Sequence, residues 1–237
     1  MELLRATAGW LLDPGHWVGP DGIPTRLEQH VVICVVSLLV AAAIALPIGT
    51  FIGHTGRGAF AAVNLANIGR AVPSYAVMVM VLPPALSLSP KYGLDVIPIF
   101  TAMTLLAIPP ILVNTFAGLR QVDPDLVEAG RGMGMRERQL LLRLELPLAL
   151  PVVLGGVRTA AVQVVATATL GAELGGGGLG RYIVDGIARQ EDDRLLAGVF
   201  LVAVLALATE AAFALAARVL TSAGVRRTAR VELDAAH

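Results

Sequence analysis

The sequence predicts an all-α integral membrane protein with five transmembrane helices. Its 237 residues are 56% hydrophobic and only 15% charged, and the mean hydropathy is +0.73. Soluble domains carry about 25% charged residues. Five apolar segments approach or exceed the roughly 20 residues that a membrane-crossing helix needs. A polar, arginine-rich stretch separates the third apolar segment from the fourth.

The five predicted spans separate the ends of the chain from a membrane domain. The spans are Val31–Ile52, Ala71–Leu88, Val96–Leu119, Leu148–Leu170 and Leu195–Ala217. Pro73, Pro83 and Pro84 make the second span the weakest, and an earlier start near Phe60 is the alternative. We expect an interfacial segment over residues 1–28, a membrane domain over 29–220 that includes a loop over 120–147, and a tail over 221–237.

The distribution of basic residues predicts the orientation in the membrane. If the 120–147 loop faces the cytoplasm, eleven basic residues lie inside and six outside. The inner set is Arg57, Arg70, Arg120, Arg131, Arg136, Arg138, Arg143, Arg218, Arg226, Arg227 and Arg230, and the outer set is Arg5, Arg26, Lys91, Arg181, Arg189 and Arg194. Because cytoplasmic loops carry the excess of Lys and Arg, we expect the amino terminus outside the cell membrane and the carboxyl terminus in the cytoplasm.

The first 28 residues lack the features of a cleavable signal peptide. No basic cluster opens the chain, and Gly9, Asp13 and Pro14 break the short apolar stretch. Trp10 and Trp17 favour the headgroup level of a bilayer. We therefore expect an interfacial segment on the extracytoplasmic face.

A strong helix start lies within the polar loop. Asp123 is a suitable N-cap, Pro124 suits the first helical position, and acidic residues suit the positive end of the helix dipole. Glycines at 130, 132 and 134 interrupt that helix, and a second short helix is expected from about Arg136 to Glu145, before Pro147. This arrangement favours a docking element for a soluble partner.

The loop also carries a spaced motif. Its form is E-A-x-x-x-x-G, nine residues, a hydrophobic residue, one more residue and L-P, with the candidate residues Glu128, Ala129, Gly130, Gly134, Met135, Leu144 and Pro147. The motif resembles the EAA signature of ATP-binding-cassette (ABC) importer permeases, in which this loop is the coupling helix that sits in a groove of the cytoplasmic ATPase. The resemblance implies a fold like that of type I ABC importer permeases. Gly130 stands where the family usually has alanine, and an ordinary amphipathic surface loop is the alternative interpretation.

Further segments resemble the osmoprotectant group of these permeases, which imports glycine betaine, carnitine, choline or proline. They are residues 67–74, 108–119, 154–160 and 177–183. The resemblance implies alternating access powered by ABC ATPase subunits, a second permease subunit (the same or homologous) and an extracytoplasmic solute-binding protein. The alternatives are a permease for another amino-acid-like zwitterion, an integral-membrane enzyme or a scaffold.

Two ionisable residues, Arg158 and Glu210, lie well inside predicted spans. A charge at the membrane centre costs roughly 2.5–3.5 kcal/mol on insertion scales, so each needs a partner. Both lie at similar depth, about 15 Å and about 12 Å from the cytoplasmic ends of their helices at 1.5 Å per residue. We predict an ion pair, which serves either as a packing clamp or directly in solute passage.

Other polar residues inside the spans are candidates for lining a translocation path. They are Asn114, Gln163 and Thr167, and the last two share a helix face because they are four residues apart. Hydrogen bonding between helices is the alternative role.

A glycine run follows the fourth span and includes Gly175, Gly178 and Gly180. Its G-x-G-x-x-G pattern would need a strand before it and a helix after it to bind a dinucleotide, and here a membrane helix precedes it. We expect either a flexible gating connection or a site of close backbone approach. No G-x-x-x-x-G-K-[ST] phosphate loop occurs, so we expect this chain to bind no ATP itself. We also expect no metal, no other cofactor and no nucleic acid.

Overall fold

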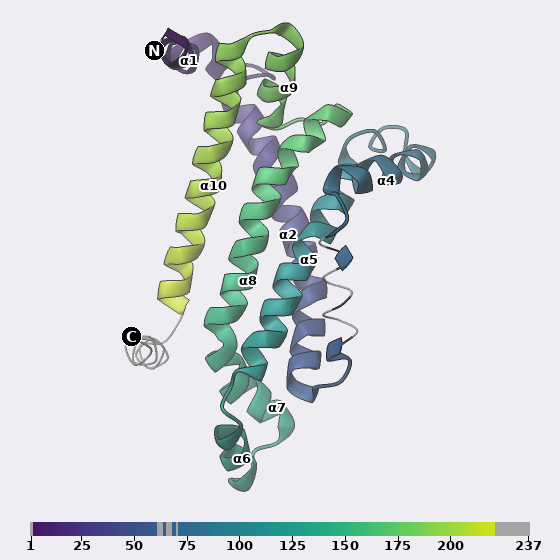
Figure 1. The fold of residues 1–237 in the computed structure, drawn as a ribbon, viewed down its shortest axis with the longest axis vertical. Coiled ribbons are helices and arrows are strands. Elements are labelled where there is room, and N and C mark those ends of the chain that lie inside the picture. Colours follow the sequence, from purple (N-terminus) through teal and green to yellow (C-terminus); the bar gives the residue numbers. More distant parts are fainter. Residues whose placement is uncertain (1, 61–63, 65–67, 70, 221–237) are drawn as a thin grey trace.

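The computed structural model describes the chain except for residues 1, 61–63, 65–67, 70 and 221–237. Within the described residues every regular element is helical. Their order is α1 (Glu2–Leu12), η1 (Pro14–Trp17), α2 (Ile23–Thr55), α4 (Ser74–Leu88), α5 (Val96–Arg120), α6 (Pro124–Gly132), α7 (Glu137–Leu140), η2 (Leu141–Glu145), α8 (Leu146–Thr167), η3 (Ala168–Leu174), α9 (Gly180–Arg189) and α10 (Asp192–Leu220). The long helices run lengthwise, with α1 and α9 at one end and α6 and α7 at the other (Figure 1).

Four helical segments of the described chain are long and apolar enough to cross a membrane. They are Ile23–Thr55, Val96–Arg120, Glu137–Leu174 and Asp192–Leu220, which agree with the first, third, fourth and fifth predicted spans. The third of these is continuous through α7, η2, α8 and η3.

The second predicted span is shorter than expected. α4 is apolar but has only 15 residues, because Pro73 is its N-cap and the helix begins at Ser74. At 1.5 Å per residue it is about 22 Å long, less than the roughly 30 Å of hydrocarbon in a bilayer. The alternative start near Phe60 falls largely outside the described residues, and so does the predicted tail over 221–237.

The first long helix begins earlier than the first predicted span, Val31–Ile52. α2 begins at Ile23, with Gly22 as its N-cap and Pro24 in its first turn. Pro is favoured in the first turn because its missing N–H would have no partner there. The last residues of the predicted interfacial segment therefore belong to the first long helix.

Glycine contacts bring the central helices together. A Cβ atom on Gly49 of α2 would lie 2.8 Å from Thr115 Cβ of α5, and one on Gly53 would lie 2.8 Å from Leu119 Cβ. These two glycines form the G-x-x-x-G spacing that permits close helix packing in membranes. On the opposite side of α5, a Cβ on Gly156 of α8 would lie 2.5 Å from Asn114 Cβ. α5 is thus held between α2 and α8.

The main buried cluster lies among these helices. It is formed by Cys34, Ala41, Ala45, Met78, Ile99, Ala102, Met103, Ala107, Ile111, Leu112, Ala160, Val164, Val165 and Ala168. α10 borders this cluster through Leu205 and Ala206, and it also packs on α1, α8 and α9. At the α1 end, a Cβ on Gly198 of α10 would lie 2.8 Å from Tyr182 Cβ of α9, which fixes α9 against the start of α10.

Candidate functional site

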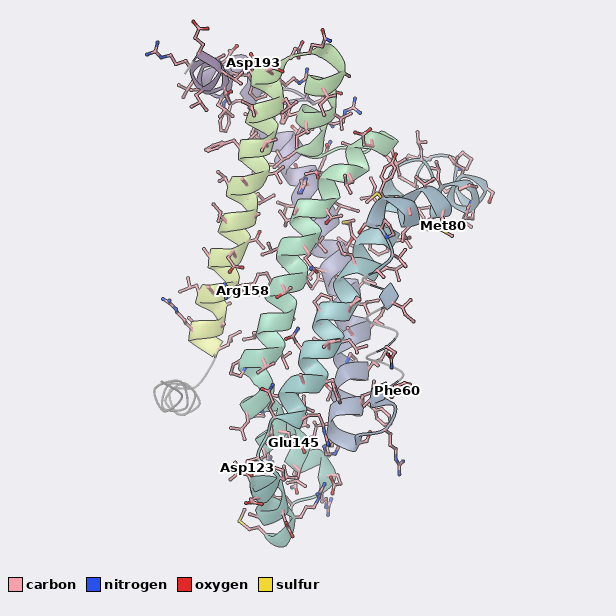
Figure 2. All side chains as sticks on the ribbon, viewed as in Figure 1. Phe60, Met80, Asp123, Glu145, Arg158 and Asp193 are labelled. Atoms are coloured by element: carbon pink, nitrogen blue, oxygen red, sulfur yellow. The ribbon has the colours of Figure 1, made fainter. Side chains whose placement is uncertain are left out.

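The helix predicted at the start of the polar loop is present. α6 covers Pro124–Gly132, and the Asp125 N–H donates to Asp123 Oδ1 at 2.9 Å. The predicted N-cap at Asp123 is therefore confirmed, with Pro124 in the first turn. α6 lies at the end of the molecule where Asp123 is labelled in Figure 2, far from α1 and α9. Glu128 and Ala129 are on its exposed surface.

Gly134 ends this helix in a Schellman motif. Its φ of +82° is in the left-handed region, which favours glycine. The Gly134 N–H donates to Arg131 O at 2.9 Å, and the Met135 N–H donates to Gly130 O at 3.1 Å. These two bonds satisfy carbonyls that the helix end leaves without a partner. The glycine of the spaced motif is thus the point at which the chain reverses.

Gly130 is the point at which α6 crosses the next helix. A Cβ there would lie 2.6 Å from Leu140 Cδ2 and 3.4 Å from Met135 Sδ. Leu144 Cδ2 would follow at 3.7 Å, so three residues of the motif region converge on one buried glycine. The departure from the family's usual alanine therefore has a steric reason, because Leu140 is fully buried and fills the space of a methyl group.

The second predicted short helix does not end before Pro147, so that prediction is wrong. α7 begins at Glu137 and passes through a π turn, Leu141–Glu145, directly into α8. Proline inside a helix removes a backbone bond and crowds the preceding turn. Here the π turn accommodates it, since the Leu146 N–H donates to Leu141 O, five residues back. The loop is therefore joined to a continuous helical rod, Glu137–Leu174.

Arg131 of α6 is held against the start of this rod. Its Nε and Nη2 atoms donate to Glu137 Oε1 and Oε2 at 2.9 and 3.1 Å. This hydrogen bonding and the Glu137 charge raise the pKa of Arg131. Bidentate guanidinium–carboxylate pairs have a defined geometry, so this exposed pair adds a directional contact between α6 and α7 to the packing at Gly130.

Sequence reasoning missed a second contact at this end. His54, at the end of α2, lies 2.5 Å from Glu145 of the π turn, measured between Nδ1 and Oε2. The two residues are 91 positions apart in the chain. No local pattern predicts such a contact, although a histidine at a span end and a glutamate inside the motif are both visible in the sequence.

The two ionisable residues inside the spans lie together. Arg158 Nη2 of α8 contacts Glu210 Oε1 of α10 as an ion pair, and Arg158 lies between these helices at mid-height in Figure 2. Their side chains are 41% and 38% exposed. They line a hollow of about 420 Å³ together with Gly155, Thr159, Val162 and Gln163.

The three candidates for a translocation path lie in different surroundings within the described part of the chain. Gln163 borders the ion-pair hollow. Asn114 lies at the α5–α8 contact, where its Nδ2 donates to Pro110 O at 2.8 Å. Thr167 is the last residue of α8. Within this single chain, Asn114 and Gln163 therefore occupy different surroundings.

The glycine run makes close backbone contacts at the opposite end from α6. Gly175 and Gly178 have φ of +88° and +86°. The Gly178 N–H donates to Gln29 Oε1 of α2 at 3.0 Å. A Cβ on Gly180 would lie 2.4 Å from Thr169 O. These contacts are of the close-approach kind that the sequence allowed as one of two roles.

Comparisons with known proteins agree with this geometry. Residues 45–222 match the family described as "Binding-protein-dependent transport system inner membrane component". The chain is 32% identical to the choline transport system permease protein OpuBB of Bacillus subtilis, over 85% of this chain and 90% of the relative. It is 35% identical to the carnitine transport permease protein OpuCB of Listeria monocytogenes, over 77% of this chain and 80% of the relative.

A solved structure shows the same fold. An inward-facing structure of the MetNI methionine ABC transporter superposes with a TM-score of 0.73 at 22% identity, covering 82% of this chain and 94% of the other. The helical fold, the spaced loop motif and the family match over residues 45–222 lead to one conclusion. The chain belongs to the family of binding-protein-dependent transport system inner membrane components, the membrane-spanning permease subunits of ABC importers.

Proposed function

We propose that this chain is the permease subunit of an ATP-driven importer for osmoprotectants such as glycine betaine, carnitine, choline or proline. The observation that carries the mechanism is the joining of α6 to the continuous rod Glu137–Leu174 through the Gly130 crossing. An ATPase that displaces α6 would act directly on a membrane helix. The choice of solute rests on similarity to relatives whose names include choline and carnitine.

We infer the partners from the family to which the chain belongs. Separate ABC ATPase subunits bind the exposed face of α6 and hydrolyse the ATP, and this chain itself holds no nucleotide or other cofactor. An extracytoplasmic binding protein delivers the solute at the α1–α9 end. α6 and α7 face the cytoplasm, and the bilayer surrounds the long helices.

A second permease subunit, the same or homologous, covers the α8–α10 face. The support is the Arg158–Glu210 pair, which lies inside a predicted span yet is more than a third exposed in the single chain. A charged pair facing lipid is costly, and such groups face protein or a water-filled cavity in membrane proteins.

Reconstitution tests the transport function. The chain is co-purified with its ATPase and incorporated into proteoliposomes, and the solute-loaded binding protein is added. We expect ATP hydrolysis to rise and labelled glycine betaine, carnitine or choline to enter. Stimulation by a different zwitterion alone would replace the proposed solute class, and hydrolysis that ignores the binding protein would contradict the importer function.

A pair of charge reversals tests the role of α6. Glu128→Lys lies on the exposed face of α6, and the matched control Glu2→Lys lies on exposed α1 at the other end. We expect the Glu128 variant to lose stimulated hydrolysis and the control to retain it. Equal activity of the two variants would contradict coupling through α6.

Single-cysteine labelling tests the orientation. Cys34 is the only cysteine and is buried, so the background is low. Met133→Cys, at the C-cap that follows α6, and Leu4→Cys, on α1, replace side chains that are 78% and 71% exposed. We expect an impermeant maleimide to label Leu4→Cys in intact cells and Met133→Cys only after permeabilisation. The reverse pattern would overturn the orientation.

A further inference from the structure

His54 lies between two carboxylates at the end of α2. Its Nδ1 lies within hydrogen-bond distance of Glu145 Oε2, at 2.5 Å, and its Nε2 lies 3.4 Å from Glu137 Oε2. The His54 side chain is 14% exposed and that of Glu145 is 8% exposed. Glu145 is labelled in Figure 2 at the α6–α7 end of the molecule. One imidazole ring thus contacts both α7 and the π turn that precedes α8.

These contacts continue into α6. Glu137 also accepts the bidentate hydrogen bonds of Arg131. A chain of polar contacts therefore runs from α6 through Glu137 to the end of α2, and from there to the π turn. It connects residues that are far apart in the sequence but adjacent at this end of the molecule.

A buried carboxylate at this position needs an explanation beyond packing. Burying a charged or polar group is costly unless it is partnered, and apolar side chains of similar volume often give equal or greater stability. Glu145 lies in the π turn, the irregular turn that joins the loop to α8. π turns inside α-helices are frequent at functional sites.

α2 is otherwise bound tightly to α5. The Gly49 and Gly53 contacts bring the two helices to within backbone packing distance. A force that reaches His54 would therefore move α2 and α5 together. α8 receives the same force through its own continuity with α7.

We propose that His54 is a positioning residue that connects α2 to the loop over residues 120–147 through its contacts with Glu145 and Glu137. Through this bridge a displacement of α6 moves the α2–α5 pair in step with α8. The proposal rests on the proposed function, because it describes how a displacement of α6 by the ATPase is transmitted to the membrane helices. Loss of the bridge removes the direct connection between α6 and α2, leaves the α2–α5 pair connected to the moving helices only through the α5–α8 contact, and keeps ATPase docking on α6 in place.

The test measures solute transported per ATP hydrolysed in the reconstituted complex. We compare wild type with His54→Leu, Glu145→Leu and the double variant. Thr55→Val is the matched control, since the Thr55 hydroxyl makes only local bonds, donating to Phe51 O and accepting from the Arg57 N–H. We expect each single variant to lower the transport ratio several-fold, the double variant to be no worse than either, and the control to match wild type.

Two conservative variants separate positioning from folding. The amide nitrogen of His54→Asn can replace Nδ1 and bond to Glu145, whereas that of His54→Gln is placed to replace Nε2. Because the Glu145 contact is the shorter one, the expected order of transport ratio is wild type, Asn, Gln and then Leu. This ranking also decides the test if His54→Leu fails to assemble.

Three results would overturn the bridge. They are a His54→Leu ratio equal to that of Thr55→Val, additive losses in the double variant, and a Gln variant that equals or exceeds the Asn variant. Failure of the wild-type complex to show stimulated uptake is a different outcome, because it contradicts the proposed function itself.

Discussion

We predict that replacing each of two adjacent glycines in α8 by alanine changes the stability of the chain in opposite directions. A Cβ on Gly156 would lie 2.5 Å from Asn114 Cβ and 2.7 Å from Pro110 O, whereas a Cβ on Gly155 would meet nothing within 4 Å. Real Cβ atoms do not approach other atoms as closely as 2.5 Å. Gly156→Ala therefore requires α5 and α8 to separate, and Gly155→Ala requires no movement.

The magnitudes follow from two opposing terms. Replacing glycine by alanine within a helix stabilises by about 0.5–1 kcal/mol. Overpacking a close contact costs about 1–3 kcal/mol. The difference between these terms gives an expected loss of up to about 2.5 kcal/mol for Gly156→Ala and an expected gain of up to about 1 kcal/mol for Gly155→Ala. At about 2–4 °C per kcal/mol for a chain of this size, the two melting temperatures move in opposite directions.

Cys34 provides the assay. It is the only cysteine and is 6% exposed within the main buried cluster. A maleimide dye that fluoresces on reaction reports its exposure as the purified chain is heated in detergent. We expect the Gly156→Ala transition below that of wild type and the Gly155→Ala transition at or above it. Equal transitions for the two variants would refute the close α5–α8 contact.

Three further predictions concern charge, backbone conformation and pH. Replacing Arg158 or Glu210 by Leu should lower the melting temperature, and the double variant should be no worse than either single variant, because each leaves the other charge unpaired. Gly134→Ala should speed amide exchange across the α6–α7 turn, since an L-residue with positive φ costs about 1–2 kcal/mol, while Gly132→Ala should slow it. Burial raises the pKa of Tyr182 from 10.0 to about 12, so stability measured by chemical denaturation should fall as pH rises through that interval, and Tyr182→Phe should lack the fall.

Each of these predictions has a result that would contradict it. Additive losses on combining the two leucine substitutions would mean that the charges do not interact. Equal exchange rates for the alanine variants at 132 and 134 would argue against the left-handed turn. The direction of the pH effect follows because the folded state holds the Tyr182 proton more tightly than the unfolded state. Stability that is flat from pH 10 to pH 12 would be inconsistent with that burial.

The sequence by itself determined the class of protein and the position of its coupling loop. Apolar length predicts helices because backbone groups in lipid must bond within their own segment. Asp123 and Pro124 predict the start of α6 because capping is a local interaction between neighbouring residues. The spacing from Glu128 to Pro147 identified the family. The Arg158–Glu210 contact was predicted from depth, because helical rise converts sequence position into height along the membrane.

Only the tertiary structure decided how these pieces contact one another. Gly155 and Gly156 are adjacent glycines that the sequence does not distinguish. Only the packing of α8 on α5 shows that a side chain at position 156 would clash and one at position 155 would not. Pro147 suggested a helix end, but the π turn carries the helix through it. His54 and Glu145 are 91 residues apart, and no periodicity or motif relates them. Contacts of this kind depend on how helices cross, which is set by side-chain packing over the whole bundle rather than by any local pattern.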